Sequence, residues 1–193
     1  KECPVGQRVQ FLLRFWTPAV WEGAADSYAD VSRALAKIHI TRRVDVDDNR
    51  ALYEKAQAYL YNDPHTPYLS QVCSFILNCY EKAWGAPGET VFTDDATWFA
   101  RQAQATGSRF PNALGDAPGD QGVRAAVDVA DADPEVDWGA MMEWLAVLES
   151  RLEMGDDPTD VWESLRNCPG FFTRVEPAAT GMVIDGGEDT REE

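Results

Sequence analysis

The chain has 193 residues and a formal net charge of −16, because 33 Asp and Glu oppose 17 Lys and Arg. Such an acidic chain binds phosphate backbones poorly, which disfavours nucleic acid as a partner. The sequence contains no run of about 18 apolar residues, so we expect no membrane-spanning helix. The length favours a single domain, which we predict over residues 1–169, followed by an extended acidic tail over residues 170–193.

The charge is unevenly distributed along the chain. Residues 1–44 have a net charge of +3, residues 45–105 of −5 and residues 106–193 of −14. A surface that carries most of the −14 segment repels itself, so we expect a basic partner to lie against it. Arg42 and Arg43 on a second copy are one candidate counter-surface. A different protein subunit with a basic surface is the preferred partner, because the net charge of +3 on residues 1–44 cannot balance the net charge of −14 on residues 106–193.

The four cysteines and the first residue bear on the compartment. Cys73 and Cys79 are six residues apart on one predicted helix and point to different sides, so they cannot bridge each other. We expect reduced, buried cysteines in a reducing compartment. The sequence begins with Lys1 rather than Met, which favours removal of a targeting segment. The expected locations are the cytoplasm or an organelle matrix.

Two helices are predicted in the first 40 residues. An apolar stripe from Val9 to Trp16 indicates a short opening helix. Thr17-Pro18 is a cap followed by a proline, and this pair is typical of a helix start. The second helix should continue to Ile38 because apolar residues recur every three or four positions.

Residues 45–85 predict the helical hairpin around which the chain is organised. Leu52, Ala56 and Leu60 lie on one side of a helix that residues 62–64 interrupt at a proline. Thr66 and Pro67 should begin the next helix, and a glycine at position 85 can end it. This second helix is apolar over most of its circumference, which predicts a central position with other helices packed around it.

The later elements complete an all-α prediction. A loop over residues 85–93, a helix to residue 102 and a long loop over residues 106–122 should precede a weak helix over residues 123–132. Asp133-Pro134 and Asp157-Pro158 should start two further helices, the first ending at Gly155. Together these elements predict an irregular helical bundle built from helical hairpins.

One acidic cluster imitates the start of an EF-hand loop. Asp45, Asp47 and Asn49 place oxygen atoms at loop positions 1, 3 and 5. The glycine and the bidentate glutamate that such a loop needs at positions 6 and 12 are replaced by Arg50 and Ala56. We therefore interpret these carboxylates as the acidic first turn of a helix, which the helix dipole favours.

A second cluster, residues 156–160, has the pattern D-D-x-x-D and resembles the magnesium-diphosphate motif of prenyl-chain enzymes. This resemblance implies one alternative function, a small Mg-dependent all-α enzyme. A proline lies inside the motif, and the chain has no convincing second aspartate set. The sequence also lacks a glycine-rich phosphate loop, a G-x-S-x-G elbow and a zinc-ligand spacing. We therefore expect neither a catalytic centre nor a cofactor.

The segment Val136-Asp137-Trp138-Gly139, continued by residues 141–145, is similar to the V-N-W-G-R segment of Bcl-2-type regulators. The resemblance implies a helical bundle that binds a partner helix in a groove. The likeness covers about ten residues. It departs at Ala140, where that family has the arginine that holds its partner.

The preferred prediction is a non-catalytic all-α interaction protein, an accessory or assembly subunit of a larger complex. It depends on the missing catalytic motifs, the helical hairpins, the polarity of charge and a surplus of aromatic residues, which anchor protein interfaces. The candidate interface residues are two tryptophans at helix ends, the arginine pair and six carboxylates: Trp21, Trp84, Arg42, Arg43, Asp128, Asp131, Asp156, Asp157, Asp160 and Glu163.

Overall fold

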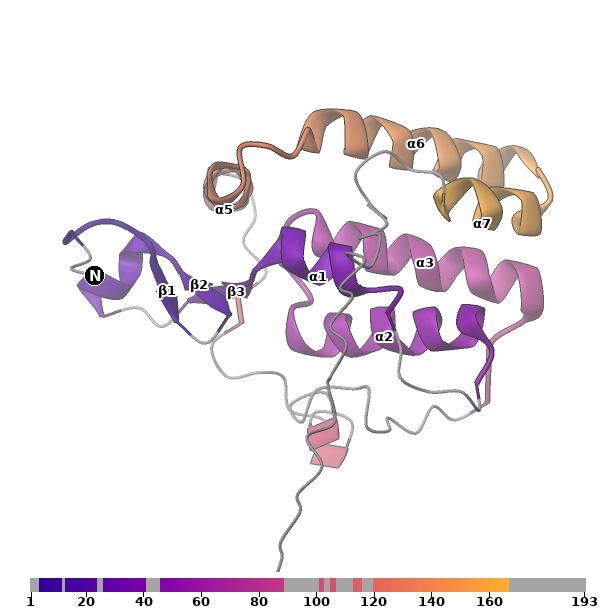
Figure 1. Cartoon of the computed structure of the whole chain (residues 1–193), viewed down its shortest axis with the longest axis horizontal. Helices are drawn as coiled ribbons and strands as arrows, with labels where there is room; N and C mark the ends of the chain where they lie inside the picture. The colour runs from indigo at the N-terminus through magenta and orange to yellow at the C-terminus, as the bar shows by residue number, and fades with distance from the viewer. Residues whose placement is uncertain are drawn as a thin grey trace, which may run out of the picture.

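A computed structural model describes residues 4–11, 13–23, 26–40, 46–88, 101–102, 105–106, 113–115 and 120–166. Within these residues the protein is mostly helical, which confirms the predicted class, and one small sheet is added (Figure 1). The helices are α1 (Val31–Lys37), α2 (Asp48–Asn62), α3 (Leu69–Trp84), α5 (Asp120–Ala132), α6 (Trp138–Met154) and α7 (Pro158–Arg166). None of the helices in these ranges has the length and apolarity that a bilayer crossing requires.

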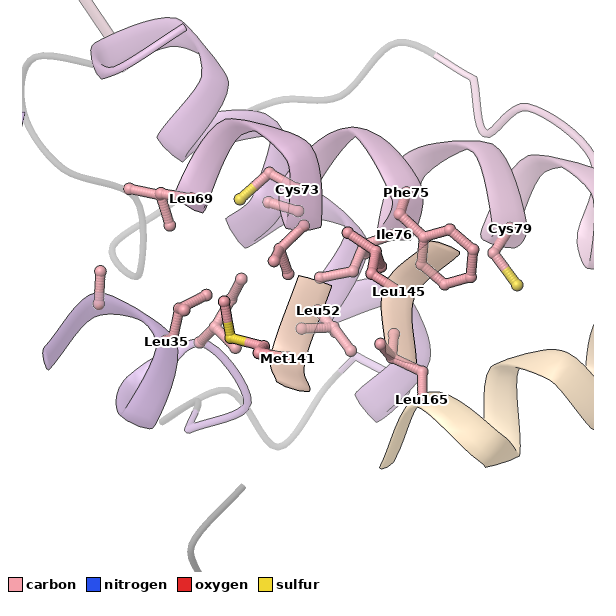
Figure 2. Close-up of a cluster of buried hydrophobic side chains, with 14 of the residues drawn as sticks. Leu35, Leu52, Leu69, Cys73, Phe75, Ile76, Cys79, Met141, Leu145 and Leu165 are labelled. Carbon is pink, nitrogen blue, oxygen red and sulfur yellow. The ribbon is translucent and has the colours of Figure 1, made fainter. Parts of the chain in front are cut away.

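Helix α3 is the centre of the bundle, as predicted. It forms an antiparallel hairpin with α2 and contacts α1, α6 and α7 (Figure 1). Most of its apolar side chains are almost fully buried, and Figure 2 shows Cys73 and Ile76 packed among leucines and a methionine from the neighbouring helices. The helix can be apolar over much of its circumference because four other helices cover it, and its exposed side carries polar residues such as Gln71, Ser74 and Asn78.

The turn between α2 and α3 differs from the prediction at the start of α3. The hydroxyl of Thr66 donates to Oδ1 of Asp63 at 3.2 Å, so it does not cap the helix. Tyr68 takes the cap position with a φ of 65°, and its backbone N–H donates to the Gln71 side chain. The helix therefore begins at Leu69, two residues after the proline.

The predicted opening helix is wrong, because residues 9–16 form a β-hairpin. Strands β1 (Val9–Phe11) and β2 (Arg14–Trp16) pair antiparallel, and β3 (Ser27–Ala29) pairs with β2 on the other side. Leu13 has a φ of 64°, a turn conformation that a helix interior cannot contain. The spacing of apolar residues alone did not distinguish a helix from a strand here. The strand that pairs with β2 comes from residues 27–29, outside the segment that carries this pattern.

The second predicted helix is also much shorter than expected. Thr17-Pro18 starts only the 3-10 helix η1 (Pro18–Glu22), which ends at Gly23 in the left-handed conformation. Helix α1 begins only at Val31, thirteen residues after Pro18. Its cap is Asp30, whose carboxylate accepts the Arg33 amide at 3.1 Å. The strand β3 occupies the segment between them and interrupts the helical pattern.

The C-terminal helices follow the prediction more closely. Helix α5 starts at Asp120, three residues before the predicted start, and α7 starts at Pro158 as predicted. Helix α6 starts at Trp138 rather than after Asp133, because Asp137 provides the cap and accepts the Ala140 amide at 2.9 Å. The predicted helix before residue 102 lies mostly outside the described residues, and the predicted tail lies wholly outside them.

Candidate functional site

The C-terminal end of α3 carries a cluster of four aromatic rings from three helices. Tyr80 contacts Tyr53 of α2, Trp84 of α3 and Trp162 of α7, with ring centroids 4.7, 5.0 and 5.8 Å apart. Trp84 also meets Trp162 edge to face at 5.3 Å. Tyr80 and Trp84 are four residues apart on one helix, so their contact follows from helical geometry. The α7 partner comes from tertiary packing.

Two hydrogen bonds hold this cluster in place. The indole N–H of Trp162 donates to Oδ1 of Asn49 at 2.9 Å, and the Tyr53 hydroxyl donates to Oε1 of Glu81 at 2.9 Å. Burial, followed by this bond to Glu81, raises the pKa of Tyr53 to about 12. Trp84 remains 45% exposed, although Trp162 beneath it is buried. A large apolar ring is therefore presented to solvent on a rigid support.

The predicted acidic residues near α7 divide into two groups. Asp156 binds Arg151 at 2.8 Å, and Asp157 accepts the amide and the hydroxyl of Thr159 at 2.8 and 2.7 Å. These bonds to Thr159 lower the pKa of Asp157. Both carboxylates thus serve the turn between α6 and α7. Asp160 and Glu163 are exposed on α7, on either side of the buried Trp162.

Asp128 and Asp131 lie elsewhere, near the C-terminal end of α5. The guanidinium of Arg8 donates to the Asp128 carbonyl at 2.9 Å and to the Asp131 carbonyl at 2.8 Å. A cation is favourable here because the carbonyls at a helix C-terminus lack intrahelical partners. Burial raises the pKa of Asp128, and Arg8 opposes that change. The basic N-terminal segment and the acidic segment therefore meet within one chain.

The structure does not bring all the predicted interface residues together. Trp21 is 42% exposed on η1, where its indole N–H donates to the Gln7 carbonyl at 2.6 Å. The sheet that adjoins η1 and the C-terminal end of α3 lie at opposite ends of the molecule (Figure 1). Trp84 contacts Trp162 of α7 at 5.3 Å, and Asp160 and Glu163 are exposed on that same helix. Arg42 and Arg43 lie outside the described residues.

The EF-hand-like aspartates begin a helix, as interpreted. Oδ2 of Asp47 accepts the amides of Asn49 and Arg50, both at 3.1 Å, and this caps α2. Asp45 lies outside the described residues. In the part of the chain that the structure describes, no group of three or more His, Cys, Asp or Glu side chains could hold a metal ion.

Trp138, the tryptophan of the Bcl-2-like segment, belongs to the core. Its ring stacks on Tyr68 at 4.8 Å, and its indole N–H donates to the Asp133 carbonyl at 3.2 Å.

No family model, curated protein or solved structure matches the chain.

Proposed function

We propose that this protein is a non-catalytic interaction protein, an accessory or assembly subunit of a larger protein complex. The half-exposed ring of Trp84, held on a rigid aromatic cluster, is the observation that carries the proposal. Tryptophans dominate binding energy at protein interfaces, and a ring that is already ordered loses little conformational entropy on binding.

The neighbouring charges support a basic partner. Asp160 and Glu163 are exposed on α7, whose Trp162 touches Trp84. Carboxylates at the rim of an interface attract a basic surface and set its orientation more than they add affinity. Trp84 supplies the apolar centre and α7 supplies the acidic rim. The buried free thiols Cys73 and Cys79 support a reducing compartment for the complex.

The experiment follows the particle size of the protein purified from its source. Size is measured by native mass analysis at low salt and at about 0.5 M salt, where the Debye length falls to about 4 Å. We expect a complex at low salt that dissociates partly as salt is raised. A monomer at every salt concentration contradicts the proposal.

A pair of tryptophan variants locates the surface. Trp84→Ala should release the partner, whereas Trp21→Ala removes a similarly exposed ring at the other end of the molecule and should retain it. Loss of a central interface tryptophan weakens binding by about 2 kcal/mol or more, which is roughly thirtyfold. If only Trp21→Ala releases the partner, the subunit proposal stands and the placement of its surface at Trp84 is wrong.

A further inference from the structure

The N-terminal hairpin has no buried core of its own. None of the residues 4–11 and 13–23 is buried, and four large apolar side chains there are between 42% and 80% exposed: Val5, Phe11, Leu13 and Trp21. Arg8 holds the hairpin to the end of α5, and Arg14 holds it to Asp63 at the α2–α3 turn. A β-hairpin alone is marginally stable in water, so apolar side chains gathered on it indicate a surface that another protein segment covers.

Strand β1 is the open edge of the sheet. The strand order is β1-β2-β3, and the β3 side is partly occupied, because Ser27 bridges Ala113 and accepts the Leu114 amide at 3.1 Å. Within the described residues no strand pairs with the outer side of β1. The outward N–H and C=O groups of an edge strand are complementary to those of another strand. An extended strand is therefore the occupant that β1 fits.

The side chains of β1 alternate between the two faces of the sheet. Gln10 pairs with Phe15, which pairs with Tyr28, so these three residues share one face. They line a cavity of about 280 Å³ between the sheet, the start of α1 and the junction of α5 with α6. Val9 and Phe11 lie on the opposite face. The strand thus has an apolar residue on each side of a central, exposed glutamine.

This pattern is complementary to itself. If two copies of β1 pair antiparallel about Gln10, the two Gln10 residues lie opposite each other and each Val9 lies opposite the Phe11 of the other copy. A twofold axis relates the copies, as in most homodimers. Aromatic and β-branched side chains form favourable cross-strand pairs, and this register contains two of them. A second copy of the chain therefore satisfies both the edge and its side chains.

The charge distribution also favours this end of the molecule for a contact between copies. Two chains that each carry a net charge of −16 repel each other. Residues 1–44, which contain the sheet, have a net charge of +3, whereas residues 106–193 have −14. The sheet and α7 lie at opposite ends of the molecule (Figure 1). Contact through β1 therefore keeps the acidic α7 helices of the two copies apart.

We propose that β1 joins two copies of this chain by antiparallel pairing about Gln10, which turns two three-stranded sheets into one continuous sheet. The contact is small, so the dissociation constant should be about 10–100 µM. This contact does not depend on the surface at Trp84, which lies at the other end of the molecule (Figure 1).

Sedimentation equilibrium of the full chain alone, from about 1 µM to about 1 mM, measures the association. We expect the mass to rise from 21.5 kDa towards twice that value. The dimer should tighten at about 0.5 M salt, because screening weakens the repulsion between two acidic chains. The complex proposed at Trp84 should weaken under the same change, so the two contacts are distinguishable.

Two variants of opposite charge test the twofold register. Gln10→Lys and Gln10→Glu should each weaken the dimer about tenfold or more, because like charges then lie directly opposite each other. A 1:1 mixture of the two variants should associate again, since each lysine then faces a glutamate. Ser150→Lys and Ser150→Glu place the same charges on the exposed side of α6 and should change the dissociation constant less than twofold.

Three results overturn the proposal. A monomer at every concentration means that a strand of a different protein, or another segment of this chain, covers β1. Association that both Gln10 variants leave unchanged places the contact on another surface. A mixture that associates no better than the separate variants shows that the substitutions disturb the hairpin and that the two Gln10 residues do not face each other.

Discussion

Cys73 and Cys79 lie on the same helix, and burial acts on both thiols. Burial and then the charge of Asp63 raise the pKa of Cys73, while burial raises the pKa of Cys79 to about 11 against the opposing effect of Lys82. The Cys79 sulfur also contacts the Pro158 carbonyl at 3.5 Å. At neutral pH both groups are therefore protonated thiols, the less reactive form.

We predict that Cys73 and Cys79 resist alkylation in the folded protein. Iodoacetamide at pH 8, followed by peptide mass mapping, should modify them at least tenfold more slowly than in the urea-unfolded chain. Because the pKa of Cys79 is higher in the folded protein than its ordinary value of 9.0, the contribution of this thiol to stability is complete below pH 9.0. The contribution is lost as the pH rises towards about 11. Equal alkylation rates in the two states would contradict the burial.

Asp47 shows how one carboxylate can resemble a metal ligand and act as a helix cap. We predict that Asp47→Ala lowers the free energy of unfolding by about 1 kcal/mol, because two backbone amides lose their acceptor. Asp47→Asn should cost only a few tenths of a kcal/mol, since asparagine caps equally well. Both losses, measured by urea unfolding, should be the same in millimolar Ca²⁺, in Mg²⁺ and in chelator. A melting shift of several degrees with metal would reverse this interpretation.

A buried ion pair joins the sheet to the helical hairpin. Arg14 of β2 donates twice to Asp63 at the α2–α3 turn, at 2.8 and 3.1 Å, and also to the hydroxyl and carbonyl of Ser27. Asp63 further accepts the Ala29 amide at 3.2 Å. The Asp63 side chain is 2% exposed, so water cannot replace the guanidinium.

We predict that Arg14→Met costs about 3 kcal/mol of stability, because it leaves a buried carboxylate without its cation. The double variant Arg14→Met with Asp63→Asn should be more stable than Arg14→Met alone, since it removes the unpaired charge as well. Urea unfolding of the three chains measures the coupling. A loss below about 1 kcal/mol for Arg14→Met would show that the pair contributes no more than a surface salt bridge.

Four Thr-Pro or Asp-Pro pairs were each predicted to start an α-helix, yet the elements that follow them differ. Only Pro158 begins its α-helix at the proline itself. Pro18 begins a 3-10 turn, and α3 and α6 start two and four residues after their prolines. A proline permits a helix start, and the nearest available cap decides where the helix begins.

For the whole molecule, the decisive element is α3. We predict that Ile76→Asp prevents folding, because a buried unpaired charge costs several kcal/mol against a total stability of about 5–15 kcal/mol. Ser74→Asp introduces the same charge on the exposed side of the same helix and should remain folded. Circular dichroism melting compares the two variants. A cooperative transition of Ile76→Asp within a degree of the parent would refute the central placement.

Local patterns along the chain were enough to predict the helical class, the α2–α3 hairpin and the central position of α3. These follow from local periodicity, since residues three and four apart share one side of a helix wherever it packs. The same reasoning identified Trp84 as a candidate contact, because a tryptophan at the end of a buried helix is not covered by the next turn. It also identified Asp47 as part of a helix start.

Long-range packing, which local patterns do not encode, produces the N-terminal sheet, the Arg14–Asp63 pair and the cavity around Tyr28. The partners in each case are brought together from segments that the sequence separates, as when Arg8 reaches the end of α5. Apolar residues at positions 9–16 fit either a helix or a strand, and the choice depended on whether another strand was available to accept their backbone hydrogen bonds. Local patterns record which side of an element is apolar, whereas long-range packing selects the neighbour that covers it.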